Sequence, residues 1–157
     1  MPKLNRQKGF TTIELLIVIL IIIILASISI LALNSQRAKA RDAKRESDIR
    51  QIRTALEFYF SDEDEYPVVA QPIVLGTGNA QKLCSKADGG FVSAETECQK
   101  VYMSQIPQDP LPDQPYTYTG SINGYDITYI TEKETANSPA GIWHAHSENI
   151  DRATGNR

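Results

Sequence analysis

A block of nineteen uncharged residues, Leu15–Leu33, constrains the fold of this chain more than any other feature of its sequence. As an α-helix the block would be about 28 Å long, close to the thickness of the hydrocarbon core of a bilayer. A buried helix of a soluble domain normally has a polar face, and this block has none from Leu15 to Leu25. Because backbone polar groups in lipid must be satisfied within the segment, the sequence predicts a membrane-spanning α-helix here.

A single carboxylate, Glu14, stands at the head of the apolar block, after a short leader with three basic residues and no acidic one. An ionised carboxylate is costly in hydrocarbon, so Glu14 must lie at the membrane surface, become protonated or meet a cation. The simplest interpretation is a glutamate at a helix start, where the helix dipole favours it. A second interpretation requires cleavage of the chain between Gly9 and Phe10. The α-amino group that cleavage creates at Phe10 would be largely protonated at neutral pH and could meet the carboxylate. Phe10 and Glu14, four residues apart, would then share a helix face and could join neighbouring copies of the chain.

The segment Lys8-Gly9-Phe10-Thr11-Thr12-Ile13-Glu14-Leu15-Leu16 resembles the prepilin signal of type IV pilins and type II secretion pseudopilins. In that family a membrane-embedded aspartyl peptidase cleaves after the glycine and methylates the new N-terminal phenylalanine. The resemblance implies that cleavage follows Gly9, that Phe10 becomes the N-methylated terminus, and that Glu14 acts in subunit docking. Many members have a glycine and a proline within the apolar helix, where this chain has Ile23 and Leu31. We therefore expect its helix to be continuous.

The same helix continues as an amphipathic segment from Asn34 to Ser61. No glycine or proline lies between Phe10 and Phe60, and apolar residues recur every three or four positions. The apolar positions are Ile49, Ile52, Leu56, Tyr59 and Phe60. The charged face offers three i,i+4 pairs, each worth about a few tenths of a kcal/mol: Lys44–Asp48, Glu46–Arg50 and Arg53–Glu57. A run of acidic residues and then Pro67 end the helix, whose apolar face is expected to pack on a downstream sheet.

Two cysteines, Cys84 and Cys98, lie in a long connection that we expect over residues 62–115. Small exported domains often add a disulfide because their apolar core is small, and a loop of this length would gain about 3 kcal/mol in the entropy model. Free thiols are the alternative, and we expect the disulfide. Pilins commonly place a disulfide near the C-terminus, so this bridge would staple a surface loop particular to this chain.

Period-two alternation indicates β-strands in the last third of the chain. Residues 116–119 and 125–131 alternate on either side of Gly120–Gly124, which predicts a hairpin with a longer loop, and residues 142–145 are a candidate third strand. An antiparallel sheet over 116–146, packed on the long N-terminal helix, gives an α+β fold that resembles pilins. We expect the polar tail, 147–157, to be frayed.

Composition and motifs argue against catalysis and against general nucleic-acid binding. The formal net charge is −3 and the sequence pI is about 5.4. There is no phosphate-binding loop and no nucleophile elbow, so no enzyme activity and no cofactor are predicted. Asp109, Asp113 and Asp126 are conceivable calcium ligands by the resemblance, and His144 and His146 would share one face of a strand. Their spacing matches no metal-site pattern, so no metal site is assigned, and the sequence leaves open whether calcium binds the C-terminal loops.

These features predict a structural subunit of a type IV pilus or a type II secretion-like pseudopilus, processed after Gly9 and polymerised through its N-terminal helix. The expected segments are a leader (1–9), a transmembrane and assembly helix (10–33), its amphipathic half (34–61), the connection (62–115), the sheet (116–146) and the tail (147–157). By the resemblance, the partners are other copies, related pilins, the prepilin peptidase, the inner-membrane assembly platform and, before assembly, membrane lipid.

The resemblance places the N-terminus in the cytoplasm and the assembled chain in an extracytoplasmic filament. Charge alone favours the opposite orientation, because seven basic residues follow the apolar block within 37–53 and only three precede it. The alternative function is a single-pass, membrane-anchored extracytoplasmic binding module, which accounts for the span but not for the Gly-Phe-x-x-x-Glu order. The sequence leaves open whether the filament is a pilus, a secretion pseudopilus or a DNA-uptake fibre.

Overall fold

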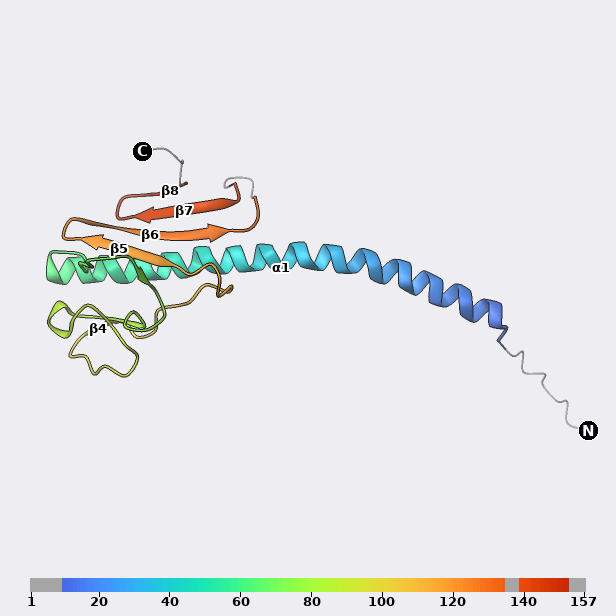
Figure 1. The fold of residues 1–157 in the computed structure, drawn as a ribbon, viewed down its shortest axis with the longest axis horizontal. Coiled ribbons are helices and arrows are strands. Elements are labelled where there is room, and N and C mark those ends of the chain that lie inside the picture. The colour runs from blue at the N-terminus through green and yellow to red at the C-terminus, as the bar shows by residue number, and fades with distance from the viewer. Residues whose placement is uncertain (1–9, 135–138, 153–157) are drawn as a thin grey trace, which may run out of the picture. The chain divides into compact units, whose positions relative to one another are not determined.

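The computed structural model describes residues 10–134 and 139–152, apart from the side chains of residues 28–32 and Arg152. Its first element is the helix α1 (Thr12–Glu63), which is continuous, as expected from the lack of glycine and proline (Figure 1). Contacts divide the chain into two units after Arg37. The part from Ala38 onward is called the head below.

Within the head, α1 buries one face. Four of the predicted apolar positions are at most 2% exposed: Ile49, Ile52, Leu56 and Tyr59. The assignment of Phe60 to this face was wrong, because Phe60 is 38% exposed and stacks on Tyr66, with ring centroids 4.6 Å apart. The helix ends at Glu63, and Asp64 follows it in the left-handed region, with a φ of 56°.

A five-stranded antiparallel sheet packs on the buried face of α1. Its strands, in spatial order, are β1 (Ile73–Val74), β5 (Thr117–Ser121), β6 (Gly124–Thr131), β7 (Gly141–His146) and β8 (Ile150–Arg152). The three predicted strands correspond to β5, β6 and β7. The predicted long hairpin loop was wrong, because Ser121 pairs with Gly124 and leaves a two-residue turn. The strand β8 pairs with β7 in the segment that was expected to be frayed.

A second, three-stranded sheet forms inside the segment that was expected to be a connection. Its strands are β2 (Lys82–Cys84), β3 (Phe91–Val92) and β4 (Val101–Met103), in the order β3-β2-β4, and a 3₁₀ helix, η1 (Lys86–Asp88), joins β2 to β3. Strands of two or three residues are too short to show a period in sequence. In Figure 1 the five-stranded sheet and the β4 region lie on opposite sides of the head portion of α1.

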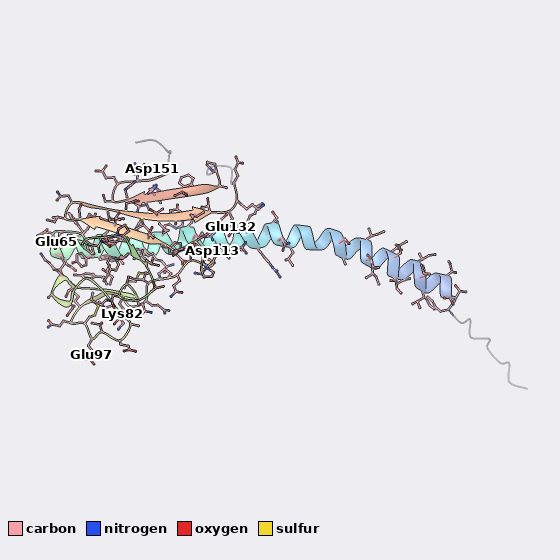
Figure 2. All side chains as sticks on the ribbon, in the orientation of Figure 1. Glu65, Lys82, Glu97, Asp113, Glu132 and Asp151 are labelled. Carbon is pink, nitrogen blue, oxygen red and sulfur yellow. A yellow bond between two sulfur atoms is a disulfide. The ribbon has the colours of Figure 1, made fainter. Side chains whose placement is uncertain are left out.

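Side chains fill the space between α1 and the strands of the head (Figure 2). Many of those in the core are tyrosines. The fully buried Tyr118 donates its hydroxyl to the carbonyl of Pro67 at 2.8 Å, and the fully buried Tyr116 donates to Asp48 at 3.1 Å. Each ring therefore buries a large apolar area while its hydroxyl keeps a partner. Among the described side chains, no buried nitrogen or oxygen lacks a hydrogen-bond partner.

Arg45 is fully buried in the head, where its guanidinium meets three carboxylates. Its Nε and Nη2 donate to the two oxygens of Asp109 at 2.7 and 2.9 Å, and Nη1 donates to Asp42 at 2.7 Å and Glu132 at 2.8 Å. We call these four residues the Arg45 cluster. Burial lowers the pKa of Arg45, but the hydrogen bonds to the carboxylates outweigh it and raise the pKa. Asp42 also accepts the backbone N–H groups of Glu132 and Lys133, so the cluster ties α1 to the residues that follow β6.

The predicted charge pairs on α1 are only partly correct. Two are present: Lys44 with Asp48 at 2.8 Å and Arg50 with Glu46 at 3.7 Å. The predicted Arg53–Glu57 pair was wrong. Arg53 Nε donates to the hydroxyl of Tyr125 at 3.4 Å, and Glu57 accepts from the hydroxyl of Tyr66 at 3.2 Å. In the folded head, the hydroxyls of Tyr125 and Tyr66 therefore take the place of the Arg53–Glu57 contact that helix spacing alone predicts.

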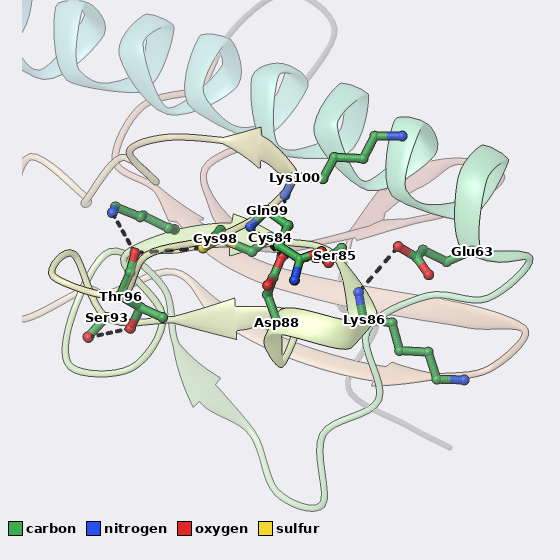
Figure 3. Close-up of a disulfide and its surroundings, with 11 residues drawn as sticks. Glu63, Cys84, Ser85, Lys86, Asp88, Ser93, Thr96, Cys98, Gln99 and Lys100 are labelled. Carbon is green, nitrogen blue, oxygen red and sulfur yellow. Dashed lines mark hydrogen bonds between the residues drawn. A yellow bond between two sulfur atoms is a disulfide. The ribbon is translucent and has the colours of Figure 1, made fainter.

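The expected disulfide joins Cys84, at the end of β2, to Cys98 (Figure 3). The Cα atoms are 6.0 Å apart, within the usual range for a disulfide. Next to it, Asp88 accepts from the hydroxyl of Ser85 at 2.6 Å and from the backbone N–H of Gln99 at 3.1 Å. The covalent bond and these hydrogen bonds together hold η1 against the segment that leads into β4.

Replacing Arg45 with methionine should strongly destabilise the head. Methionine fills a similar volume but leaves three carboxylates without their cation, and removing one partner of a buried ion pair typically costs about 3–5 kcal/mol. Chemical unfolding of the full chain in detergent measures the loss. The control R50M, at an exposed arginine, should change stability by less than about 0.5 kcal/mol. Equal stability of R45M and the unmodified chain would contradict the structural role of Arg45.

The low pKa of Glu132 predicts a specific sensitivity to acid. The hydrogen bond from Arg41 is the largest cause, and the one from Arg45 adds to it, so the pKa falls to about 2. Because this value lies below the unfolded reference of about 4.3, the ionised carboxylate stabilises the fold above that pH. That stabilisation is lost as the pH falls from there towards about 2.

Unfolding midpoints recorded through this acid range should fall more steeply for the unmodified chain than for E132Q, which has no carboxylate to titrate. Parallel curves for the two proteins would show that Glu132 does not contribute the expected dependence.

Reducing the disulfide should loosen the small sheet first. The chain has two cysteines, so a reductant acts on this bridge alone. A disulfide of this loop length typically contributes about 2–4 kcal/mol. We expect amide hydrogen exchange to accelerate in β2 and β4 on reduction, while β6 stays protected. Equal acceleration in both sheets would contradict a local role for the disulfide.

Candidate assembly site

Thr11 and Glu14 form the start of α1. The N–H and the hydroxyl of Thr11 donate to Oε2 of Glu14 at 3.0 and 2.9 Å, and the N–H of Glu14 donates to the hydroxyl of Thr11 at 3.3 Å. This reciprocal arrangement is a capping box, which satisfies free donors at the helix start. It agrees with the interpretation of Glu14 as a helix-start glutamate. Our prediction did not include Thr11, although the Thr-x-x-Glu spacing was readable in the sequence.

Phe10 precedes the helix and is 82% exposed. The expectation that Phe10 and Glu14 share a helix face was wrong, because Thr11 caps the helix and the first helical residue is Thr12. Gly9 lies outside the described residues. Both Thr11 donors go to Oε2 of Glu14, so Oε1 accepts no hydrogen bond from any residue in the described part of the chain.

The first turns of α1 present a broad apolar surface. The large apolar side chains from Ile13 to Leu25 are each between 45% and 63% exposed. Ser27 returns its hydroxyl to the carbonyl of Ile23 at 2.7 Å, so it adds no free polar group. A contiguous apolar surface of this kind typically marks contact with lipid or with other proteins.

The membrane expectation for residues 10–33 falls partly on residues 28–32, whose side chains lie outside the description. Among the helical residues that are described, none form a stretch both long enough and apolar enough to cross a bilayer.

Of the candidate metal ligands, Asp126, His144 and His146 lie close to one another. Asp109 is held by Arg45, and Asp113 is exposed. Asp126 lies on β6 with its Oδ2 2.8 Å from Nδ1 of His144, and His146 Nδ1 lies 3.9 Å from the other oxygen. Within 10–134 and 139–152, no three His, Cys, Asp or Glu side chains are arranged to hold a metal ion. The candidate functional site is the exposed apolar surface of α1 together with its first residues.

Two family models match the chain. The model described as "Type II secretion system (T2SS), protein G" matches residues 32–140, and the model described as "Prokaryotic N-terminal methylation motif" matches residues 4–30. The second match covers the segment that resembles the prepilin signal, including Gly9, Phe10 and Glu14.

Curated relatives agree with the family models. The type II secretion system core protein G of Aeromonas hydrophila is 35% identical over 109 residues, which cover 68% of each chain. The protein of the same name from Klebsiella pneumoniae is 33% identical, over 68% of this chain and 71% of its own length. The protein of that name from Pseudomonas aeruginosa is 31% identical, over 73% of this chain and 74% of its own length. No solved structure matches the chain. The resemblance to pseudopilins is thus confirmed, and this chain belongs to the protein G family of type II secretion systems.

Proposed function

We propose that this protein is a structural subunit of a type II secretion pseudopilus. The single observation that carries the proposal is the order of the chain: a methylation motif, an exposed apolar helix and a head matched by the protein G family model. Sequence alone did not distinguish a pilus, a pseudopilus and a DNA-uptake fibre, and the names of the relatives favour the pseudopilus. The role is that of a building block rather than a catalyst.

Processing precedes assembly in this proposal. A prepilin peptidase cleaves after Gly9, and Phe10 becomes the N-methylated terminus. The match of the methylation motif over residues 4–30 supports this, as does the exposure of Phe10 ahead of the helix. The subunit is anchored in the cytoplasmic membrane by residues 10–33, with its N-terminus in the cytoplasm, until the assembly platform inserts it into the filament.

The apolar surface of α1 alone neither drives assembly strongly nor sets how neighbouring subunits align. Moving an apolar helix from lipid to a bundle of similar helices yields little hydrophobic gain, since lipid is as apolar as leucine. Polar contacts must then set the register. Glu14 supplies one, because Oε2 closes the capping box while Oε1 can accept from the amino group of Phe10 on the next subunit.

Two measurements test the proposal in cells with an active prepilin peptidase. Mass spectrometry of envelope fractions should find Phe10 as the methylated N-terminus. The variant E14Q keeps an acceptor for the Thr11 donors but loses the charge, so it should insert in the membrane and fail to assemble. The matched control T11V weakens the capping box, leaves the charge of Glu14, and should assemble.

Filaments that retain the first nine residues would contradict the processing step. A filament yield for E14Q equal to that of the unmodified chain would remove the docking role of Glu14. A membrane-anchored binding module, the alternative function, would tolerate replacement of residues 15–33 by another apolar span, whereas a pseudopilus subunit would lose assembly.

A further inference from the structure

A groove of about 430 Å³ runs along the head between α1 and the β7–β8 side of the five-stranded sheet. The helix lines it with Glu46, Ile49, Arg50 and Arg53, and the sheet lines it with Tyr129, Trp143 and Ile150. Ile150 is 39% exposed. The groove therefore combines two cations and the carboxylate of Glu46 with an apolar and aromatic wall.

The two arginines of this groove have donors to spare. Arg50 reaches Glu46 at only 3.7 Å, beyond hydrogen-bond distance, and its side chain is 65% exposed. Arg53 makes one long hydrogen bond of 3.4 Å to the neutral hydroxyl of Tyr125. By contrast, every nitrogen of the Arg45 guanidinium donates to a carboxylate within 2.9 Å. Arg50 and Arg53 can thus donate hydrogen bonds to a carboxylate of another molecule without breaking a strong contact.

The end of α1 has the complementary character. Asp62 and Asp64 are exposed, and α1 has no basic residue in its last turn. Acidic residues at a helix C-terminus face the negative end of the helix dipole, so an external cation would stabilise them. Lys100 contacts Asp62 at 2.5 Å, while no contact of the Asp64 carboxylate is found within the described residues. Phe58, which is 61% exposed, lies four residues before Asp62 on the same helix face.

We propose that the groove receives the acidic end of α1, Asp62–Asp64, from a second copy of this chain. This inference rests on the proposed function and adds a contact between heads to the contact between N-terminal helices. The carboxylates pair with Arg50 and Arg53, and Phe58 packs against the apolar wall formed by Trp143 and Ile150. Because the two surfaces differ, the contact is head-to-tail and can repeat along a filament without closing.

The position of both surfaces on one helix sets the spacing of the copies. About eleven or twelve residues separate Arg50–Arg53 from Asp62–Asp64, which corresponds to roughly 17 Å along an α-helix. Parallel copies in contact through these surfaces are therefore offset by about that distance along the filament. An exposed ion-pair contact of this kind fixes register and weakens with added salt.

Charge reversal of the full chain tests the contact. The variants R50E/R53E and D62K/D64K should each lower filament yield about tenfold, because like charges would face each other. Combining all four substitutions restores complementary charge and should return the yield close to that of the unmodified chain. The control E95K/E97K reverses two exposed acidic residues between β3 and β4 and should leave the yield unchanged. Thermal unfolding of each variant shows whether the head still folds.

A cross-link identifies the partner surface directly. R50K/R53K keeps the charge of the groove and adds amines that a carbodiimide can couple to carboxylates. In filaments of mixed isotope-labelled and unlabelled chains, we expect links from positions 50 or 53 to Asp62 or Asp64 of a different copy. Links to other residues, or assembly of folded R50E/R53E at the normal yield, would overturn the inference and leave the proposed function intact. Failure of the unmodified, processed chain to form filaments would overturn both.

Discussion

The head depends on one buried cation. The guanidinium of Arg45 has no exposed surface, and three carboxylates satisfy it: Asp42, three residues away on α1, and Asp109 and Glu132, from distant parts of the chain. A buried charge without partners would cost several kcal/mol, so these residues must be brought together for α1 to dock on the sheet. Asp42 also binds the backbone after β6. One ion therefore holds together α1, the segment that carries Asp109 and the end of β6.

Long and periodic elements were predictable from the sequence. The apolar spacing of α1 and the alternation of β5, β6 and β7 are local patterns, because each element contains several repeats of its period. The strands β1, β2, β3, β4 and β8 contain two or three residues each, so they have no pattern to read. Their existence depends on partners in space. The two-residue turn at Ile122–Asn123 likewise follows from the pairing of Ser121 with Gly124.

The candidate site was predictable to the extent that it is a linear motif. Gly9, Phe10 and Glu14 stand in a recognisable order, and the family comparison covers that segment. The local geometry differed from the expectation because Thr11 caps the helix and excludes Phe10 from it. The Arg45 cluster could not be predicted, because Asp109 and Glu132 lie 64 and 87 residues from Arg45. In the sequence Arg45 is one of seven basic residues in a charged run.

These separations have a consequence for how the protein reaches its native state. A chain made from its N-terminus produces Arg45 long before Glu132, and closing so large a loop carries an entropy cost that local contacts do not repay. Until β6 has been synthesised, the Arg45 guanidinium stays hydrated and α1 has no fixed position against the sheet. Docking is then a late, cooperative event, and a truncated head that ends before Glu132 would keep its helix while lacking ordered tertiary structure.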